Sequence, residues 1–138
     1  MSLIKRLRSI QNRLSQEEKE DREKLKSEVE EKLKKSVSDF VKGLPERLVY
    51  AAEKGKKGEF FTIYTLGEST HLFFELKRHG IELSLRNFDH CFDEVRAFCK
   101  RESLHLVINI SLVDEKDKPL QSLFSHYLSY EVSVRIQW

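Results

Sequence analysis

The amino-acid sequence predicts an α+β protein: a long N-terminal helix followed by a three- or four-stranded, mostly antiparallel sheet with helices packed on one face. Three observations predict this fold class. Apolar residues recur at helical spacing in the first third of the chain, they alternate with polar residues in two segments of the last third, and the middle switches between both periods. Because a helix repeats every 3.6 residues and a strand every two, these periods distinguish helical from extended segments.

Length and charge limit the class of protein. The chain has 138 residues and a formal net charge of +2, so it suits a single domain and has no strong overall field for nucleic acid or anionic lipid. The charge is nevertheless uneven, because residues 1–14 contain four basic residues and no acid. Any electrostatic preference for a partner therefore depends on this first segment.

Residues 3–14 have the pattern of an amphipathic helix. The apolar positions, spaced mainly by three and four, form one stripe: Leu3, Ile4, Leu7, Ile10 and Leu14. The basic residues lie largely off this stripe: Lys5, Arg6, Arg8 and Arg13. Such a stripe needs a cover, which its own domain, a second copy, or an outside partner or membrane surface could supply. Because a polar stretch separates it from the rest of the chain and no aromatic residue lies on it, we expect self-association.

A capping box stands directly after this segment. Ser15-Gln16-Glu17-Glu18 matches the S-x-x-E pattern, in which the serine and the glutamate bind each other's backbone N–H groups at a helix start. We expect a break or bend near Ser15, with one continuous helix as the alternative.

The next residues divide into a polar spacer and an apolar seam. Residues 16–24 contain no apolar side chain and must stand in solvent, whereas Leu25, Val29 and Leu33 follow at intervals of four. This inner seam predicts packing against a globular body or a second helix, and we assign these three residues to the contact surface together with the N-terminal stripe. We expect residues 1–42 to form a helical arm with a solvated spacer and residues 43–138 to form a compact α+β domain.

Glycine and proline mark the next boundaries. Gly43 can end the first helix, Pro45 suits the first turn of a short second helix, and Gly55 can close it. Residues 59–66 are aromatic and β-branched on both faces, which predicts a strand in the centre of its sheet.

The second half of the chain alternates helix and strand. Residues 69–79 predict a helix that ends at Gly80, residues 81–85 a possible short strand, and Asn87 the N-cap of an amphipathic helix. Residues 104–113 and 128–138 alternate apolar and polar side chains and should pair as an antiparallel hairpin. Residues 120–126 fit either a loop or a short helical turn.

The two cysteines indicate a reducing compartment. Cys91 and Cys99 are eight positions apart on one predicted helix. This spacing puts their Cα atoms about 12 Å apart, beyond the ~7 Å limit for a disulfide. We expect buried free thiols, which suit the cytoplasm, and no apolar run is long enough for a transmembrane helix.

No motif indicates a reaction, a metal or a cofactor. The five histidines and two cysteines show no zinc-ligand spacing, no G-x-S-x-G turn occurs, and the glycines at 55 and 58 precede a strand where a phosphate loop would open a helix. Titratable residues could gather only on a strand face, from His105, Tyr64, Glu131 and Arg135.

These observations predict a non-enzymatic protein–protein interaction or assembly module that self-associates as a dimer or larger through its N-terminal helix, or binds a helical protein partner. The first alternative is a nucleic-acid-binding protein that uses the basic residues of that helix. The second is a small enzyme with a pocket on the strand face. We expect no cofactor.

Overall fold

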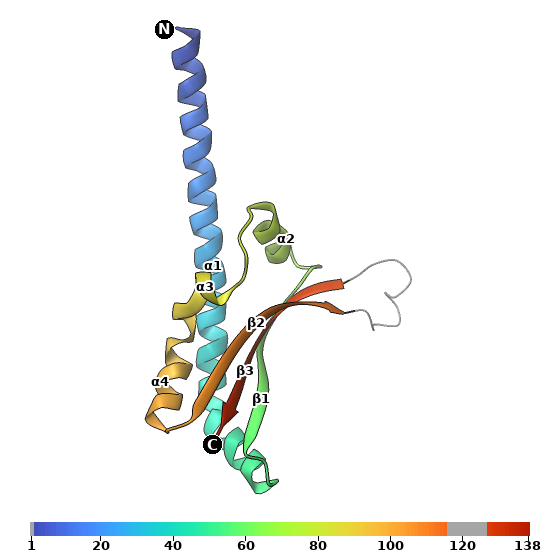
Figure 1. Cartoon of the computed structure of the whole chain (residues 1–138). Helices are drawn as coiled ribbons and strands as arrows, with labels where there is room; N and C mark the ends of the chain where they lie inside the picture. The colour runs from blue at the N-terminus through green and yellow to red at the C-terminus, as the bar shows by residue number, and fades with distance from the viewer. Residues whose placement is uncertain (1, 116–126) are drawn as a thin grey trace.

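The computed structural model describes residues 2–115 and 127–138, and within them a long helix precedes a three-stranded antiparallel sheet and several short helices (Figure 1). In chain order the elements are α1 (Leu3–Glu53), β1 (Gly58–Gly67), α2 (His71–Arg78), α3 (Leu85–Phe88), the 3-10 helix η1 (Asp89–Phe92), α4 (Asp93–Arg101), β2 (His105–Glu115) and β3 (Tyr127–Gln137). The predicted α+β fold class is therefore confirmed. The prediction for residues 120–126 lies outside the described residues.

Helix α1 runs without interruption through Ser15, so the expected break there is wrong. The helix is capped instead at Ser2, whose Oγ accepts a hydrogen bond from the Lys5 N–H at 3.3 Å. Around Ser15 the chain is rich in strong helix formers, and Gln16 Nε2 donates to Glu20 Oε1 at 3.2 Å one turn later. Because continuing a helix is easier than nucleating a new one, the serine stays inside it and the capping box is not used.

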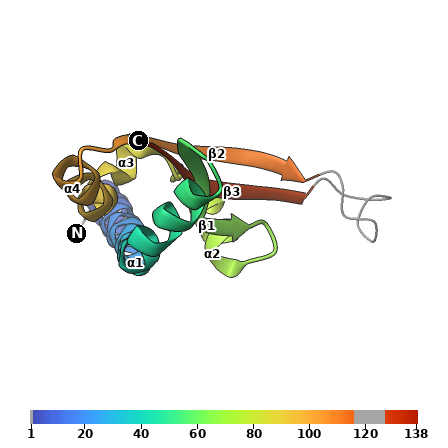
Figure 2. The same cartoon turned by 90° about the horizontal axis from the view of Figure 1, so that it is seen from below.

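The expected helix end at Gly43 is also wrong. Helix α1 continues through Gly43 and Pro45 to Glu53 and changes direction near its C-terminal end (Figures 1 and 2). Proline has no N–H to donate to the preceding turn, and its ring pushes that turn aside, so it bends a helix that packing holds together. The predicted end at Gly55 is confirmed, because this residue adopts a left-handed φ of +83° just after the last turn.

The sheet order is β1-β3-β2, so β3 lies in the centre and the prediction of a central β1 is wrong. Residues 59–66 are apolar on both faces for a different reason: Phe60 points to an uncovered face, where its side chain is 57% exposed. A bulge between Thr62 and Tyr64 also shifts the register on β3. The predicted hairpin is confirmed, with Leu106 opposite Ile136 and Ile108 opposite Val134.

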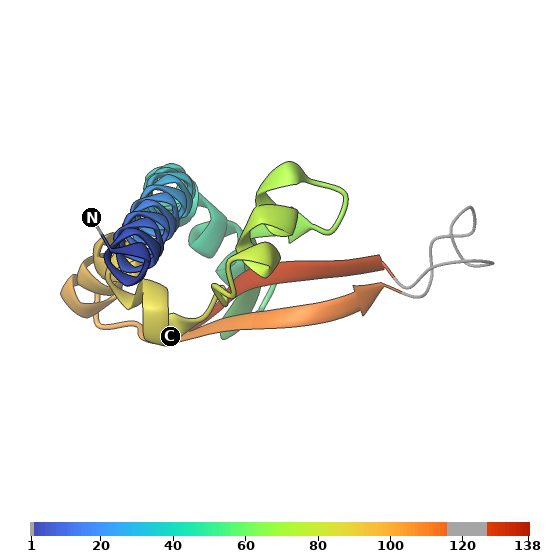
Figure 3. The ribbon, with the colours of Figure 1, turned by 90° about the horizontal axis from the view of Figure 1, so that it is seen from above.

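All the described helices lie on the same side of the sheet, as the view along α1 shows (Figure 3). The core between them combines the rear of α1, the central strand and the short helices. Its most deeply buried side chains are Val29, Leu33, Val37, Leu44, Leu76, Leu83, Phe88, Phe92, Val95, Val132, Val134 and Ile136. No helix in the described parts of the chain is both long enough and apolar enough to cross a membrane.

The segment between α2 and β2 differs from the sequence prediction. Helix α2 buries Leu72, Phe73 and Leu76, and Thr70 caps it by accepting the Phe73 N–H at 3.3 Å. Residues 81–84 form no strand, and one amphipathic helix is replaced by α3, η1 and α4 in succession. Asn87 lies inside α3 and its side chain donates to the Glu82 carbonyl at 3.0 Å, so its capping amide is used to fix the preceding loop.

Candidate functional site

The first part of α1 stands clear of the rest of the molecule (Figure 1), and every residue from Ser2 to Lys24 is exposed. We call residues 3–24 the arm. At about 1.5 Å per residue the arm extends roughly 33 Å beyond the first core residue of α1. The five aliphatic side chains of its stripe are between 43% and 70% exposed: Leu3, Ile4, Leu7, Ile10 and Leu14. Monomeric proteins rarely expose a row of large aliphatic side chains of this length.

The predicted interface residues fall into two groups. Leu25, Val29 and Leu33 are 8%, 0% and 0% exposed and belong to the core of the chain itself, where α1 packs on η1, α4 and β1. These three residues are already covered, so only the five residues of the arm remain available to a partner. Leu14 and Leu25 are eleven residues apart, which is about three helical turns, so stripe and seam lie on the same side of α1.

The basic residues of the arm are exposed beside the stripe. Arg13 Nε lies 3.9 Å from Glu17 Oε1, with both side chains largely in solvent, so this pair contributes little to stability. Within residues 2–115 and 127–138, Lys5, Arg6 and Arg8 form no ion pair. Their charges are therefore free to act on a partner.

The polar spacer does more than separate the stripe from the core. The Arg22 guanidinium donates a hydrogen bond to the main-chain carbonyl of His79, at the C-terminal end of α2. A cation in this place is favoured by the partial negative charge of a helix C-terminus. The base of the arm is thereby held against the domain, although its side chains remain exposed.

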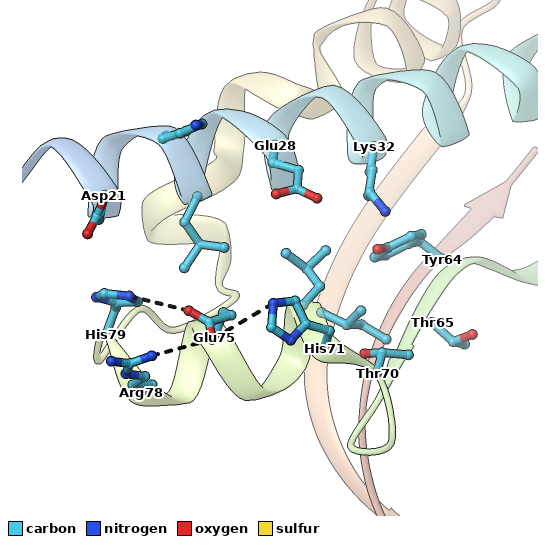
Figure 4. Close-up of a pocket in the computed structure, with 14 residues that line it drawn as sticks. Asp21, Glu28, Lys32, Tyr64, Thr65, Thr70, His71, Glu75, Arg78 and His79 are labelled. Atoms are coloured by element: carbon cyan, nitrogen blue, oxygen red, sulfur yellow. Dashed lines mark ion pairs between the residues drawn. The ribbon is translucent and has the colours of Figure 1, made fainter.

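A polar cleft of about 790 Å³ lies between α1, the end of β1 and α2 (Figure 4). Glu75 is its most connected group: its carboxylate lies 3.5 Å from His79 Nε2, 3.7 Å from an Arg78 nitrogen and 3.9 Å from His71 Nε2. This cluster was not among the sites predicted from the sequence. The spacing of His71, Glu75 and His79 by four residues is the signal that could have revealed it.

The charged groups that line the cleft lie close to groups that carry or can carry the opposite charge. Burial, with the negative charge of Glu28 as a smaller cause, raises the pKa of Tyr64, so this phenol stays neutral and can donate a hydrogen bond. Glu75 is surrounded by cationic or protonatable partners, and Glu28 and Lys32 extend from α1 on the opposite wall. Among the described residues no group of three His, Cys, Asp or Glu side chains could hold a metal ion. We find no nucleophile and base held together in this cleft.

The predicted strand-face cluster is not brought together. Tyr64 pairs with Val132 and points toward α1, whereas Glu131 pairs with Thr65 on the other face of the sheet. Arg135 is on that same face, but it lies four residues from Glu131 along β3, a separation of about 13 Å. His105 pairs with Gln137 at the strand end. These four side chains therefore do not line one pocket.

Both cysteines are free and buried, as predicted. The His90 Nε2 lies 3.9 Å from Cys91 Sγ, an arrangement that resembles a nucleophile with its base. However, burial and the nearby Glu30 carboxylate raise the pKa of the Cys91 thiol, and burial raises that of Cys99. His90 is instead engaged with Glu30 Oε1 at 3.3 Å. A thiol with a raised pKa is a poor nucleophile. The contact between His90 and Glu30 connects η1 to α1.

Comparisons with protein-family models, curated proteins and solved structures give no match to this chain. The functional argument therefore depends on the surfaces and clefts described above. Of these, the arm is the feature that exposes five large aliphatic side chains along one helix.

Proposed function

We propose that this protein is a non-enzymatic assembly module that self-associates through the arm. One observation carries the proposal: a continuous helix presents five large aliphatic side chains to solvent, well away from the core of its own domain. Covering such side chains is favourable by roughly 25 cal/mol for each Å² of apolar surface removed from water. A partner that lies along the arm would gain this free energy without any rearrangement of the domain.

The spacing of the stripe supports a second copy of the chain as that partner. Leu3, Leu7, Ile10 and Leu14 follow each other at intervals of four, three and four, which is the spacing of apolar positions in a two-helix coiled coil. In a parallel pair Arg13 would face Glu18 of the second copy, so opposite charges would flank the last apolar layer. A helical protein with the same spacing would be an alternative partner.

The test compares the native chain with a stripe variant, Leu7→Glu together with Leu14→Glu. We expect the native chain to be a dimer or larger at tens of micromolar and the stripe variant to lose this association, as measured by sedimentation velocity. Ser9→Glu with Asn12→Glu is the matched control, because it adds the same charge to exposed positions off the stripe. Equal masses for the native chain and the stripe variant would refute the proposal.

The two free, buried cysteines are consistent with a reducing compartment, and we propose the cytoplasm as the location.

A second candidate function, nucleic-acid binding, is favoured by the uncompensated charges of Lys5, Arg6 and Arg8. It requires an affinity that falls steeply with salt, because each phosphate contact releases counterions. Charge reversal of Arg6, Arg8 and Arg13 should then abolish binding to single- or double-stranded DNA and RNA. Absent or salt-independent binding would exclude this function and leave self-association unaffected.

A further inference from the structure

Strand β2 forms an edge of the sheet that no other described element pairs with. Among the described strands its only neighbour is β3, and beyond the loop that follows α4 its outer side is uncovered in two views (Figures 2 and 3). Such an edge presents unpaired N–H and C=O groups in alternation. Natural edges are usually protected by charged residues or proline. Asp114 and Glu115 place charge at the C-terminal end of β2, but residues 106–113, LVINISLV, contain neither charge nor proline.

The burial of β2 indicates a missing neighbour on this side. On the central strand Val132, Val134 and Ile136 are completely buried, whereas the residues opposite them on β2 are only half-buried. Val107 on the open face and Leu112 on the helix-covered face are 48% and 52% exposed. One additional strand would flank both of these side chains.

We propose that β2 pairs antiparallel with β2 of a second copy around a two-fold axis at Ile110, which joins the two sheets into one of six strands. Residues 107–113 of β2 are self-complementary about this axis, whereas at the ends of the strand Leu106 would meet Asp114 and His105 would meet Glu115. On the open face Val107 would meet Val113 and Asn109 would meet Ser111, while on the covered face Ile108 would meet Leu112. Apolar residues thus oppose apolar ones, and an amide opposes a hydroxyl, as stable cross-strand pairs require.

This self-complementarity is the reason to choose a second copy over an unrelated extended peptide. Around a two-fold axis, if residue i of one copy meets residue j of the other, then j also meets i, so the strand must be complementary to its own reverse. A shift of the axis to Asn109 would oppose Val107 to the polar Ser111. The proposal uses a surface distinct from the arm and does not require the proposed function. If both surfaces operate, each chain has two isologous contacts, so copies would add in alternation into open chains unless the geometry closes them.

Single cysteines provide a test that is specific for the register. Asn109→Cys and Ser111→Cys are made separately in the stripe variant, mixed, and oxidised with oxidised glutathione. Directly opposite residues have Cα atoms about 5 Å apart and can form a disulfide, whereas 109 would lie about 8 Å from its own symmetry mate. We expect a cross-linked dimer from the mixture and little from either variant alone. The same low yield in the mixture as in the separate variants would overturn the proposed register.

A charge variant tests whether the edge itself associates. In the stripe variant, Asn109→Lys with Ser111→Lys would place four added positive charges around the axis. We expect the stripe variant to be dimeric at high concentration and this further variant to be monomeric. Thr62→Lys with Thr65→Lys on β1 is the matched control, because it adds the same charge to the same face at the opposite edge, and it should leave the dimer intact.

The outcomes separate the two surfaces. A stripe variant that is monomeric at every concentration and gives no cross-link overturns the edge proposal and leaves the arm proposal untouched. Cross-linking of the cysteine mixture together with equal masses for the native chain and the stripe variant would support the edge proposal and refute the arm proposal.

Discussion

Helix α1 contains two regions that share a backbone and differ in their surroundings. Residues 3–24 expose every side chain, while residues 25–53 bury seven, including Leu25, Val29 and Leu33. The apolar side chains of both regions lie on the same side of the helix. The regions differ in whether the rest of the chain packs against that side. An amphipathic pattern thus identifies which face of a helix will be covered without identifying what will cover it.

The comparison also explains why the arm is helical. An isolated helix of about twenty residues is marginal in water, because nucleation is unfavourable. The packed region of α1 supplies a nucleus from which the arm can propagate. Pairs such as Arg13 with Glu17 and Gln16 with Glu20 then add a few tenths of a kcal/mol each.

The largest expected difference between the two regions comes from the same substitution made in each. Leu33→Ala leaves a cavity where the native side chain is 0% exposed, and should lower the free energy of unfolding by about 2–5 kcal/mol. Leu7→Ala removes a side chain that is 51% exposed and should change the unfolding of a dilute sample by less than ~0.5 kcal/mol. Urea unfolding followed by the fluorescence of Trp138, the single tryptophan, measures both.

Protein concentration is the control for this pair. The effect of Leu7→Ala should grow as concentration rises if the arm associates, since binding to the folded state adds to its stability. The effect of Leu33→Ala should not depend on concentration. Equal losses in dilute samples would mean that the arm is covered by its own domain.

The difference between a local residue pattern and the elements that pack against it also decides what could be predicted from the sequence. The helical and strand periods are local, so they correctly predicted a helix in the first part of α1, helix α2 and the β2–β3 hairpin, but not that one helix runs unbroken from Leu3 to Glu53. The position of β1 at an edge could not be predicted, because the exposure of Phe60 depends on the open face of the sheet and on the bulge after Thr62. Aromatic residues on both sides of a segment predict a strand, but they do not predict which strands lie beside it.

The candidate sites show the same limit. The sequence predicted the stripe from Leu3 to Leu14 and the buried thiols, because each lies on one element. The cleft around Glu75 and the edge of β2 require the spatial arrangement of separate elements, which spacing alone does not contain. Gly43 and Pro45 misled the prediction for a related reason: they weaken a helix, but packing of Leu44 and Ala51 keeps it continuous.

A smaller effect tests the continuity of α1 in its packed region. Gly43→Ala should raise the free energy of unfolding by about 0.5–1 kcal/mol, because alanine is the better helix former and its Cβ would meet only the Arg47 Nε at 4.0 Å. Gly55→Ala should lower it by ~1 kcal/mol, since φ is +83° there. Urea midpoints compare the two, and a loss on Gly43→Ala would mean that the helix ends where the sequence first indicated.

The smallest effect is expected at Ser15, where the sequence predicts a break and the structure has a continuous helix. Inside a continuous helix Ser15→Ala should be neutral or stabilise the arm by at most ~0.5 kcal/mol, because alanine has the higher helix propensity. At a true N-cap the same change would cost about 1 kcal/mol. Ser2→Ala is the matched control, because Ser2 Oγ accepts the Lys5 N–H and its loss should fray the first turn. Hydrogen exchange is read at the first turn after each serine, in the amides of residues 3–6 for Ser2→Ala and of residues 16–19 for Ser15→Ala. Faster exchange of the amides of residues 16–19 in Ser15→Ala than in the native chain would show that a helix begins at Ser15, and the stripe and the seam would then no longer share one side of a continuous helix.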